Sequence, residues 1–458
     1  MGLRAFLAIA LCKLLRLLSR VLHRGGTAMP GEYALKVCPN LLAILAKDVT
    51  SVAVTGTNGK TTSSRMIEEA LAEQGESYFA NRSGANLITG ITTEFVMNCT
   101  LGGKMKKHLA VIECDEAAAR KVFGQLKPKV IVVTNLFRDQ LDRYGEVTHT
   151  LENIREGIRN VPEAVLCLNA DCSLTASLAE DLPNPVVWFG INEGAAPSAA
   201  KPEISDATHC LRCKTEYEYS YITYGHLGGY RCPNCGRARH AADYAVTRVA
   251  ELGMSHSVIR LSFRGEEREI RVNLPALYNI YNAAGAAAAL CTAGYPIDRV
   301  AAAMQSFQCG FGRMEQFDQL GKAGAKMMLV KNPAGCSQVV EFLSSIKEDF
   351  ALVVCLNDRG ADGRDVSWIW DADFDRIPEF GERLKAVAVS GDRAADMRVR
   401  LKYAGVDDRL ITVEKDYEKL VAWVNEQEVP VFLMPTYTAM LELREVVIRH
   451  CGGAEFWE

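Results

Sequence analysis

Residues 51–75 read SVAVTGTNGKTTSSRMIEEALAEQG and join an apolar run, a turn with two glycines and a helical segment. The apolar run predicts a buried strand, and the spacing of apolar residues after Lys60 predicts a helix. Gly56 and Gly59 let the backbone approach a phosphate closely, and the N-terminus of the helix adds aligned N–H donors. Lys60 supplies charge to the terminal phosphates, and the hydroxyl of Thr61 suits Mg²⁺. The stretch therefore predicts a phosphate-binding loop between a strand and a helix.

The alternation of strands and helices continues on both sides of this loop. The first series of apolar runs comprises SVAVTG, LAVIEC, VIVVTN and AVLCLN, each ending in polar or glycine residues. A second series starts near residue 325, after an Ala-rich helical stretch, and comprises MMLVKN, FALVVCLN, AVAVSG and VFLMPT. This pattern predicts an α/β protein with parallel sheets in two domains. We expect an ATP-binding domain at 46–308, with an insert at 205–240 after an exposed linker at 192–208, and a smaller Rossmann-like α/β domain at 316–458.

The composition is that of an ordinary globular protein. Of 458 residues, 48% are hydrophobic and 24% charged, and the formal net charge of −4 gives no basic field for nucleic acid. Fifteen cysteines are too few for a disulfide scaffold. Cys114, Cys167 and Cys355 lie in apolar runs and are typical of reduced core thiols. We therefore expect a cytoplasmic protein without a nucleic-acid partner.

Residues 1–45 contain a basic amphipathic helix and a lead-in to the first domain. The basic residues of the helix share one face and are Lys13, Arg16, Arg20 and Arg24. The apolar residues of the opposite face are Leu7, Ala10, Leu11, Leu14, Leu18, Val21 and Leu22. The cluster GGTAMPG at 25–31 predicts a boundary after this helix. Three interpretations stay open: packing on its own domain, contact with an anionic membrane surface, and a cleaved signal.

Four segments together resemble the Mur ligase family, which includes the folylpolyglutamate synthetases. TGTNGKTT at 55–62 is similar to the family's ATP loop, although Val54 stands where the common phosphate-loop pattern has its first glycine. The other three are TNLFRDQLDRYGE at 134–146, YNIYNAAGAAAA at 278–289 and GRME at 312–315. The resemblance implies ligation through an acyl phosphate: ATP phosphorylates a carboxylate, and an amine then displaces the phosphate.

The resemblance also implies the residues of the nucleotide site. Those of the loop that would hold the ATP phosphates are Gly56, Thr57, Asn58, Gly59, Lys60, Thr61 and Thr62. Thr61 and Glu113 would bind Mg²⁺, and a carboxylate at the carboxyl end of a neighbouring strand suits that role. Asn279 and Asn282 align with positions near the adenine, and Arg313 with an arginine that reaches the nucleotide. For these last three, capping or surface polarity is an equally good explanation.

The sequence departs from the family at three places. Gln140 stands at the position of a metal-ligating histidine, and an amide is a weaker ligand. VKNPAG at 330–335 lacks the ribose-binding aspartate of typical members. The ATP loop also lies so near the start of the sequence that the N-terminal UDP-sugar domain of typical members has no room. We therefore expect the substrate to be anchored differently.

Four cysteines of the insert have metal-ligand spacing. Cys210, Cys213, Cys232 and Cys235 form the pattern C-x₂-C-x₁₈-C-x₂-C, which is typical of a zinc ribbon. Gly236 fits the turn that such a pair requires. Four thiolates close the coordination sphere of Zn²⁺ and predict a structural role; a disulfide pair or free thiols are the alternatives. Strand residues covering a small core are predicted at Tyr217, Tyr219, Tyr221, Tyr224 and Tyr230, and surface residues at His209, His226 and His240.

A loop rich in aspartate follows the strand FALVVCLN in the second domain. It reads DRGADGRDVSWIWD and places Asp358, Asp362 and Asp365 at the carboxyl end of a predicted parallel strand, where open α/β sheets carry functional groups. Turn formation and helix capping explain these acids equally well. KNPAG, the four-cysteine insert and ADGRDVSWIWD together resemble one branch of the family, the ligase subunits of lipid II isoglutaminyl synthases.

This closer resemblance implies a specific reaction in peptidoglycan synthesis. The α-carboxylate of D-glutamate in the stem peptide of lipid II is amidated to D-isoglutamine at the expense of ATP, at the inner face of the cell membrane. Ammonia comes from a GatD-like glutamine amidotransferase subunit in a heterodimer, and Asp362 orients the histidine of that partner. Two alternatives remain: a ligase that adds an amino acid, and a nucleotide-binding scaffold without activity, against which Lys60, Thr61 and Glu113 argue.

Overall fold

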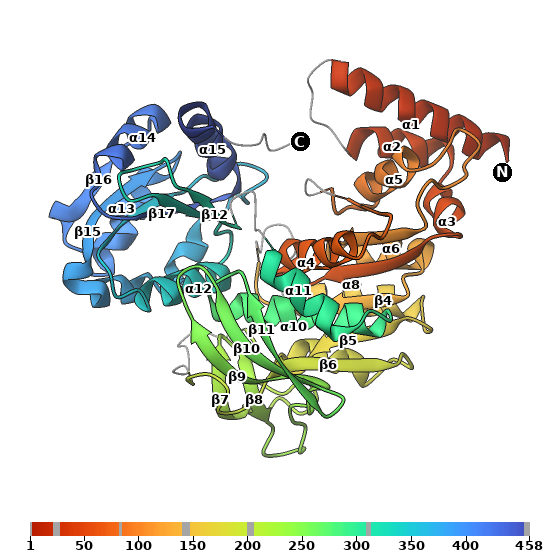
Figure 1. Cartoon of the computed structure of the whole chain (residues 1–458), viewed down its shortest axis with the longest axis horizontal. Helices are drawn as coiled ribbons and strands as arrows, with labels where there is room; N and C mark the ends of the chain where they lie inside the picture. The colour runs from red at the N-terminus through yellow and green to blue at the C-terminus, as the bar shows by residue number, and fades with distance from the viewer. Residues whose placement is uncertain are drawn as a thin grey trace. The chain divides into compact units, whose positions relative to one another are not determined.

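The structure is a computed structural model that describes residues 2–21, 28–81, 85–139, 147–198, 206–307 and 313–452. The chain divides into two compact units (Figure 1). The first comprises Met1–Phe137 and Val147–Phe307, and the second comprises Arg138–Glu146 and Gln308–Glu458.

The first unit is built on one large sheet. Among its described residues, nine strands pair in the order β11-β10-β9-β6-β5-β4-β1-β3-β2. In this spatial order, the seven strands from β9 to β2 run parallel to one another. Strand β10 is antiparallel to both of its neighbours, β9 and β11. The bounds are β1 Thr50–Thr55, β2 Tyr78–Ala80, β3 Leu109–Glu113, β4 Val130–Val133, β5 Val165–Asn169, β6 Val186–Ile191, β9 Tyr244–Leu252, β10 Ser257–Phe263 and β11 Glu266–Val272. The first four predicted strands are thereby confirmed as β1, β3, β4 and β5, and their continuous apolar runs reflect burial on both faces.

Helices cover this sheet. The bounds are α1 Leu3–Val21, α2 Ala28–Val37, α3 Leu41–Ala46, α4 Lys60–Glu73, α5 Ile88–Met97, α6 Ala119–Leu126, α8 Val147–Arg159, α9 Ser173–Ala176, α10 Leu277–Thr292 and α11 Ile297–Ser306. Helix α4, which follows the phosphate loop, packs against β1, α10 and α11. The predicted helical stretch near 282–303 is confirmed as α10 and α11. None of the described helices is long and apolar enough to cross a membrane.

The predicted boundary after the first helix agrees with the bounds of α1 and α2, at Val21 and Ala28, but the described part of the cluster at 25–31 is helical. Residues 28–31 lie inside α2, and residues 22–27 lie outside the described part. Gly31 serves packing rather than a turn, because a β-carbon there would lie 1.9 Å from the carbonyl oxygen of Thr89. The glycine thus lets α2 approach α5. Of the expected linker at 192–208, residues 199–205 also lie outside the described part, while Ala195 is buried.

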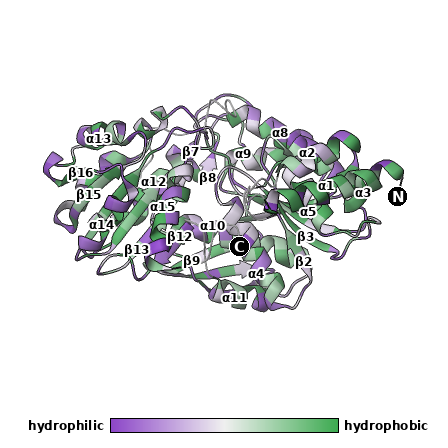
Figure 2. Cartoon of the chain, turned by 90° about the horizontal axis from the view of Figure 1, so that it is seen from above, coloured by the Kyte–Doolittle hydropathy of each residue, from purple (hydrophilic) through white to green (hydrophobic). Residues whose placement is uncertain are grey.

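Helix α1 packs on its own unit, but not through its leucine face. Its buried residues are Ala5, Ala8, Ile9, Cys12 and Ser19. The ammonium of Lys13 donates to the carbonyl oxygens of Val96 and Cys99 at 2.7 and 2.8 Å, at the C-terminal end of α5. A cation is favourable at this end of a helix because the last carbonyls lack intrahelical partners. Small residues and one lysine therefore fix α1, which is coloured as largely hydrophobic in Figure 2.

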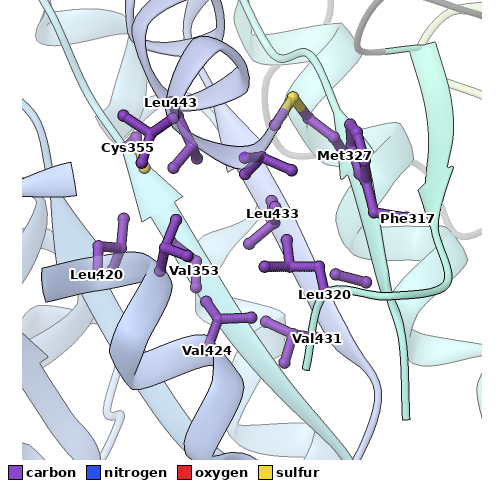
Figure 3. Packing of buried hydrophobic residues seen from close by; sticks show 14 of the residues in the cluster. Phe317, Leu320, Met327, Val353, Cys355, Leu420, Val424, Val431, Leu433 and Leu443 are labelled. Atoms are coloured by element: carbon purple, nitrogen blue, oxygen red, sulfur yellow. The ribbon is translucent and has the colours of Figure 1, made fainter. Parts of the chain in front are cut away.

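The second unit contains a smaller sheet. Its described strands pair in the order β12-β13-β17-β14-β15-β16, and only the β12–β13 pair is antiparallel. Leu433 of β17 and Val353 of β14 are fully buried in its core (Figure 3). The strand bounds are β12 Arg313–Phe317, β13 Ala325–Met328, β14 Phe350–Cys355, β15 Leu384–Ser390, β16 Ile411–Val413 and β17 Val431–Pro435. The helix bounds are α12 Pro333–Ser344, α13 Ala394–Tyr403, α14 Tyr417–Glu426 and α15 Tyr437–Cys451.

The second series of predicted strands is confirmed as β13, β14, β15 and β17. Strand β13 ends at Met328, earlier than the apolar run MMLVKN indicates. The reason is the start of α12, where the side chain of Asn332 accepts a hydrogen bond from the backbone N–H of Gly335 at 2.7 Å and Pro333 occupies the first turn.

Candidate active site

The phosphate loop follows β1 and turns on its two glycines. Gly56 and Gly59 have φ angles of 119° and 86°, which other residues rarely adopt. A β-carbon at Gly56 would lie 2.4 Å from the hydroxyl oxygen of Thr134, and one at Gly59 would lie 2.0 Å from the Oδ1 of Asn282. Backbone conformation and close approach thus both require glycine, and they bring the loop to the N-terminus of α4.

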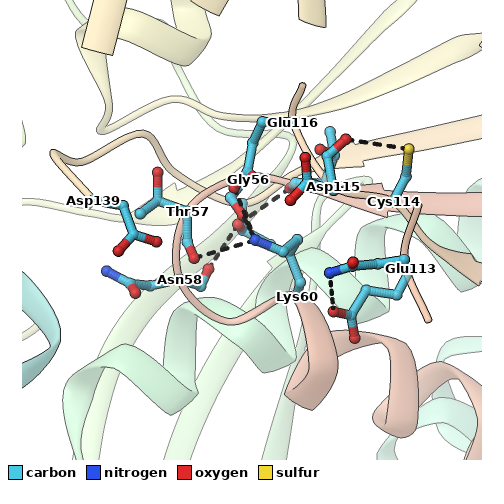
Figure 4. A network of polar contacts seen from close by, with 12 residues as sticks. Gly56, Thr57, Asn58, Lys60, Glu113, Cys114, Asp115, Glu116 and Asp139 are labelled. Carbon is cyan, nitrogen blue, oxygen red and sulfur yellow. Dashed lines mark hydrogen bonds and ion pairs between the residues drawn. The ribbon is translucent and has the colours of Figure 1, made fainter. Parts of the chain in front are cut away.

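Lys60 turns back into this loop (Figure 4). Its ammonium lies 2.5 Å from the carbonyl oxygen of Gly56 and 2.8 Å from the Oε1 of Glu116. Burial disfavours the charged form, but Glu116 and Glu113 outweigh this effect and raise the pKa of Lys60. The side chain is therefore a buried, fully protonated cation beside the backbone that would cradle phosphates.

Thr61 and Glu113 meet at the edge of the loop, from the first turn of α4 and the end of β3. The hydroxyl of Thr61 donates to the Oε2 of Glu113 at 2.7 Å. Asn81 holds the backbone of Glu113 on both sides: its Oδ1 accepts from the N–H at 2.9 Å, and its Nδ2 donates to the carbonyl at 2.7 Å. Hydroxyl and carboxylate oxygens are the ligands that Mg²⁺ prefers, so this donor set fits that ion.

The segment after β4 holds the loop from behind. Thr57 exchanges two hydrogen bonds with the backbone of Phe137, through the Phe137 N–H at 3.0 Å and the Phe137 carbonyl at 3.1 Å. Asn135 does the same for Asn58: its Oδ1 accepts from the Asn58 N–H at 3.0 Å, and its Nδ2 donates to the Asn58 carbonyl at 3.1 Å. Four hydrogen bonds therefore hold two loop residues, Thr57 by its side chain and Asn58 by its backbone.

The structure brings only some of the remaining predicted nucleotide residues to the loop. Asn282 of α10 lies against Gly59 and donates to the Oδ1 of Asn279 at 3.2 Å. Thr62 is buried in the first turn of α4. Arg313 begins β12 in the second unit, and its approach to a nucleotide stays a prediction. Gln140 lies outside the described residues.

Sequence reasoning missed Glu116 and Asn135. Glu116 is buried and pairs with Lys60. The signal for it is the acidic run Glu-Cys-Asp-Glu at 113–116, which begins at the last residue of β3. Asn135 lies in the segment at 134–146, which resembles a family motif but in which no site residue is predicted from the sequence. The segment VKNPAG, which departs from the family pattern, contains an ion-paired lysine: the ammonium of Lys331 lies 2.6 Å from a carboxylate oxygen of Asp139.

The four cysteines of the insert converge as predicted. Their sulfurs all lie within 4.8 Å of one another, with 3.6 Å between Cys210 and Cys235 and 3.4 Å between Cys213 and Cys232. Each pair is followed by a residue with positive φ, Lys214 and Gly236. Hydrogen bonds from Thr215 lower the pKa of Cys213 to about 5. A closed set of four sulfurs, one of them readily deprotonated, fits a structural Zn²⁺.

A two-stranded ribbon follows the first cysteine pair, with β7 at Glu218–Tyr224 and β8 at Leu227–Arg231. Tyr217 and Tyr230 are buried beside Cys210 and Cys232, which confirms that they cover a small core. His209 and His240 are exposed, but the prediction of a surface position for His226 is wrong.

His226 is buried because the turn of the ribbon packs on Phe137. The two rings have centroids 4.5 Å apart, and Tyr224 stacks on the same phenylalanine at 5.8 Å. The imidazole Nε2 of His226 lies 3.3 Å from the sulfur of Cys172. The ribbon therefore supports the residue whose backbone brackets Thr57.

The aspartate loop of the second unit follows β14. Asp362 is buried, and its carboxylate accepts hydrogen bonds from the N–H of Thr438 at 2.7 Å and from the Thr438 hydroxyl. Thr438 lies in the first turn of α15, where a carboxylate is stabilised by the unpaired N–H groups. Asp365 is exposed and accepts from the N–H of Ser367 in a turn that leads into the short helix η2 at Ser367–Trp370. The N-cap position of η2 is Val366, so Asp365 forms the turn and does not cap the helix. Asp358 pairs with Arg393 at 3.0 Å.

Comparison with known proteins places these sites in a family. The family model described as Mur ligase middle domain matches residues 54–242, and the one described as MurT ligase C-terminal matches residues 329–440. The subunit MurT of lipid II isoglutaminyl synthase (glutamine-hydrolyzing) from Streptococcus pneumoniae is 35% identical, over 92% of both chains. The chain belongs to the MurT family of Mur ligases. The MurT subunit from Staphylococcus aureus strain COL is 32% identical over 99% of this chain and 100% of the relative.

Solved structures share the fold. A pseudomurein peptide ligase type C from Methanothermus fervidus superimposes with a TM-score of 0.66 at 20% identity, over 88% of this chain and 79% of the other. MurF ligase from Thermotoga maritima, solved in complex with ADP, has a TM-score of 0.60 at 14% identity, over 91% and 84% of the two chains. The expected Mur-type fold is therefore confirmed.

Proposed function

We propose that the protein is the ligase subunit of a lipid II isoglutaminyl synthase. It amidates the α-carboxylate of D-glutamate in the stem peptide of lipid II and consumes ATP. Its MurT relatives are named for this synthesis. The arrangement of Lys60, Thr61 and Glu113 supports the proposal most directly, because it supplies a cation and oxygen ligands at a turn built for phosphate.

The loop would hold ATP through its backbone N–H groups and Lys60. A phosphate entering the loop offers Lys60 the oxygen partners that the carbonyl of Gly56 and the carboxylate of Glu116 now provide. The positive charge then lies where negative charge develops on the transferred phosphoryl group. Thr61 and Glu113 would hold Mg²⁺, which neutralises phosphate charge when bound.

The chemistry that this site supports has two steps. The α-carboxylate oxygen attacks the terminal phosphorus of ATP, the bond to the bridging oxygen breaks, and ADP leaves. Ammonia then attacks the carbon of the acyl phosphate and loses a proton, and inorganic phosphate departs with the oxygen that the carboxylate contributed. The product is the amide, so no oxidant or reductant is required.

We further propose that a GatD-like glutamine amidotransferase subunit supplies the ammonia and docks beside Asp362. A groove of about 510 Å³ adjoins this loop, and its lining includes Arg364, Asp365 and Trp370. Trp370 is 49% exposed, and its ring meets that of Tyr403, which is 76% exposed. Exposed aromatic residues of this kind are enriched at protein interfaces. The carboxylate of Asp362 would orient a histidine of the partner, as the third member of a shared triad.

Two further assignments complete the proposal. The four cysteines hold a structural Zn²⁺ that replaces a hydrophobic core in the insert. The reaction takes place in the cytoplasm at the inner face of the membrane, where a lipid-linked substrate is accessible.

The test uses this chain alone with Mg-ATP, lipid II and ammonium chloride, followed by mass spectrometry of the stem peptide. We expect conversion of one carboxylate to an amide with release of ADP. Addition of a free amino acid instead would identify an amino-acid-adding ligase. If neither product forms, and the chain also fails with a glutaminase partner present, a non-catalytic nucleotide-binding scaffold would replace the proposal.

A further inference from the structure

Helix α1 exposes a continuous apolar stripe to solvent. Leu3, Leu17 and Val21 are 74%, 59% and 68% exposed. The other large apolar residues of the stripe, also exposed, are Phe6, Leu7, Leu14 and Leu18. At 100° per residue, all seven fall within about one third of the helix circumference. Single exposed leucines are normal on a protein surface, but seven on one helix face mark an interaction site.

The packing of α1 keeps this stripe outward. The opposite face is occupied, since Ala5, Ala8 and Cys12 are buried against the rest of the unit. Lys13 adds two hydrogen bonds to the end of α5. Burying the stripe against the same unit would require α1 to rotate and break these contacts.

The charge of α1 favours one kind of partner. The helix carries Arg4, Lys13, Arg16 and Arg20 and contains no acidic residue. On a helical wheel, Arg4 borders one edge of the stripe, and Arg20 borders the other together with Lys13. Arg4 and Arg20 are exposed. An apolar face flanked by cations suits the boundary between the acyl chains and the anionic headgroups of a bilayer.

We infer that the stripe of α1 binds the surface of an anionic lipid bilayer, with the helix lying in the plane of the interface. The apolar side chains enter the acyl region, and the two arginines remain at headgroup level. The inference rests on α1 itself and does not depend on the amidation reaction. It deepens the proposed location at the membrane, because it names the residues that make the contact.

The experiment is sedimentation of the full chain with vesicles that contain neither lipid II nor nucleotide. Vesicles of phosphatidylglycerol and phosphatidylcholine in roughly equal parts are compared with phosphatidylcholine alone. We expect binding to the anionic vesicles that weakens with added salt. Combined Leu14→Gln, Leu17→Gln and Leu18→Gln substitutions should lower the partition coefficient about tenfold or more, while glutamine preserves the helix.

Two further variants separate the contributions. Arg4→Gln with Arg20→Gln should lower binding to the anionic vesicles about fivefold for each charge removed. Leu101→Gln with Leu252→Gln changes exposed leucines elsewhere in the same unit, and this control should bind like the unaltered protein.

Several results would overturn the inference. One is failure of the unaltered chain to sediment with anionic vesicles, and another is equal binding by the triple leucine variant. A third is a dimer in solution that the leucine variant converts to monomers without any vesicle binding, which would assign the stripe to a second copy. None of these results bears on amidation, which is measured separately with ammonium.

Discussion

The phosphate loop and the Asp362 loop stand at the same kind of place in two different sheets, yet they hold their charged groups differently. Each follows a buried parallel strand and turns at a glycine with positive φ, 86° at both Gly59 and Gly363. In the first loop, Lys60 rests on a backbone carbonyl and on the carboxylate of Glu116. In the second loop, Asp362 accepts hydrogen bonds from Thr438 at the start of α15.

The two loops differ in whether they contain all the functional groups that their proposed chemistry requires. The phosphate loop has a cation and a hydroxyl from the start of α4 and a carboxylate from the end of β3, so one unit carries the groups that phosphate and Mg²⁺ require. The Asp362 loop offers a rigidly held acid, and an acid that orients an imidazole requires a histidine from elsewhere. Substitutions in the first loop should therefore affect the ligase reaction itself, whereas those in the second should affect the supply of ammonia.

The largest effect is expected for Lys60→Ala. Removing the only cation shown within the described loop should lower kcat/KM for amidation about 10²-fold or more, with ammonium and with glutamine alike. Steady-state assays with each nitrogen source measure this loss. Lys104→Ala changes an exposed lysine of the same unit and should leave both rates intact. A Lys60→Ala enzyme that keeps its ammonium-driven rate would remove the loop from the mechanism.

Cys232→Ser should abolish zinc binding and weaken the phosphate loop indirectly. One lost thiolate opens the four-sulfur site, and the ribbon whose turn supports Phe137 should loosen. Metal analysis and nucleotide titration give the two readouts: zinc content near zero and a higher Kd for ADP.

Cys451→Ser alters a thiol outside the cluster and serves as the control for both measurements. A zinc-free Cys232→Ser protein with normal stability and nucleotide affinity would contradict the structural role.

Glu113→Gln should raise the Mg²⁺ concentration needed for half the maximal rate by about tenfold. The amide keeps the volume of the side chain but removes the charge that attracts the ion. Titrating Mg²⁺ at fixed ATP measures the change, with the exposed Glu156→Gln as the matched control. An unchanged requirement for Mg²⁺ would assign Glu113 to the positioning of Thr61 alone.

The smallest effect is expected for the stability of Asp362→Asn. An amide NH₂ would face the hydroxyl of Thr438, a donor opposite a donor unless that hydroxyl turns. The free energy of unfolding in urea should fall by about 1–3 kcal/mol. Asp365→Asn should be nearly neutral, because asparagine accepts a turn hydrogen bond as well as aspartate does. Equal stability of the two variants would mean that Asp362 does not hold its loop.

Local sequence patterns predicted eight strands of the two large sheets, the phosphate loop, α10 and the cysteine cluster, because these features depend on residues close together in the chain. The remaining strands of the two sheets, which include the antiparallel edge β9-β10-β11, were not predicted. Glu116 and Asn135 escaped because their partners, Lys60 and Asn58, lie far away in sequence. His226 was placed on the surface for the same reason, since its burial is created by Phe137.

The orientation of α1 shows a different limit. The periodicity of its sequence defines a basic face and an apolar face, but it does not show which side of the helix packs on the protein. Small residues and the contact of Lys13 with α5 decided this, and both depend on the shape of the neighbouring helix.

The most direct measurement compares two nitrogen sources for Asp362→Asn in complex with the glutaminase subunit. The amidated product is quantified by mass spectrometry with ammonium chloride and, separately, with glutamine. We expect the ammonium-driven rate to stay close to that of the unaltered complex, while the glutamine-driven rate falls about 10²-fold or more. Equal loss with both nitrogen sources would contradict the division of work between the two loops and assign Asp362 to the ligase reaction or to folding.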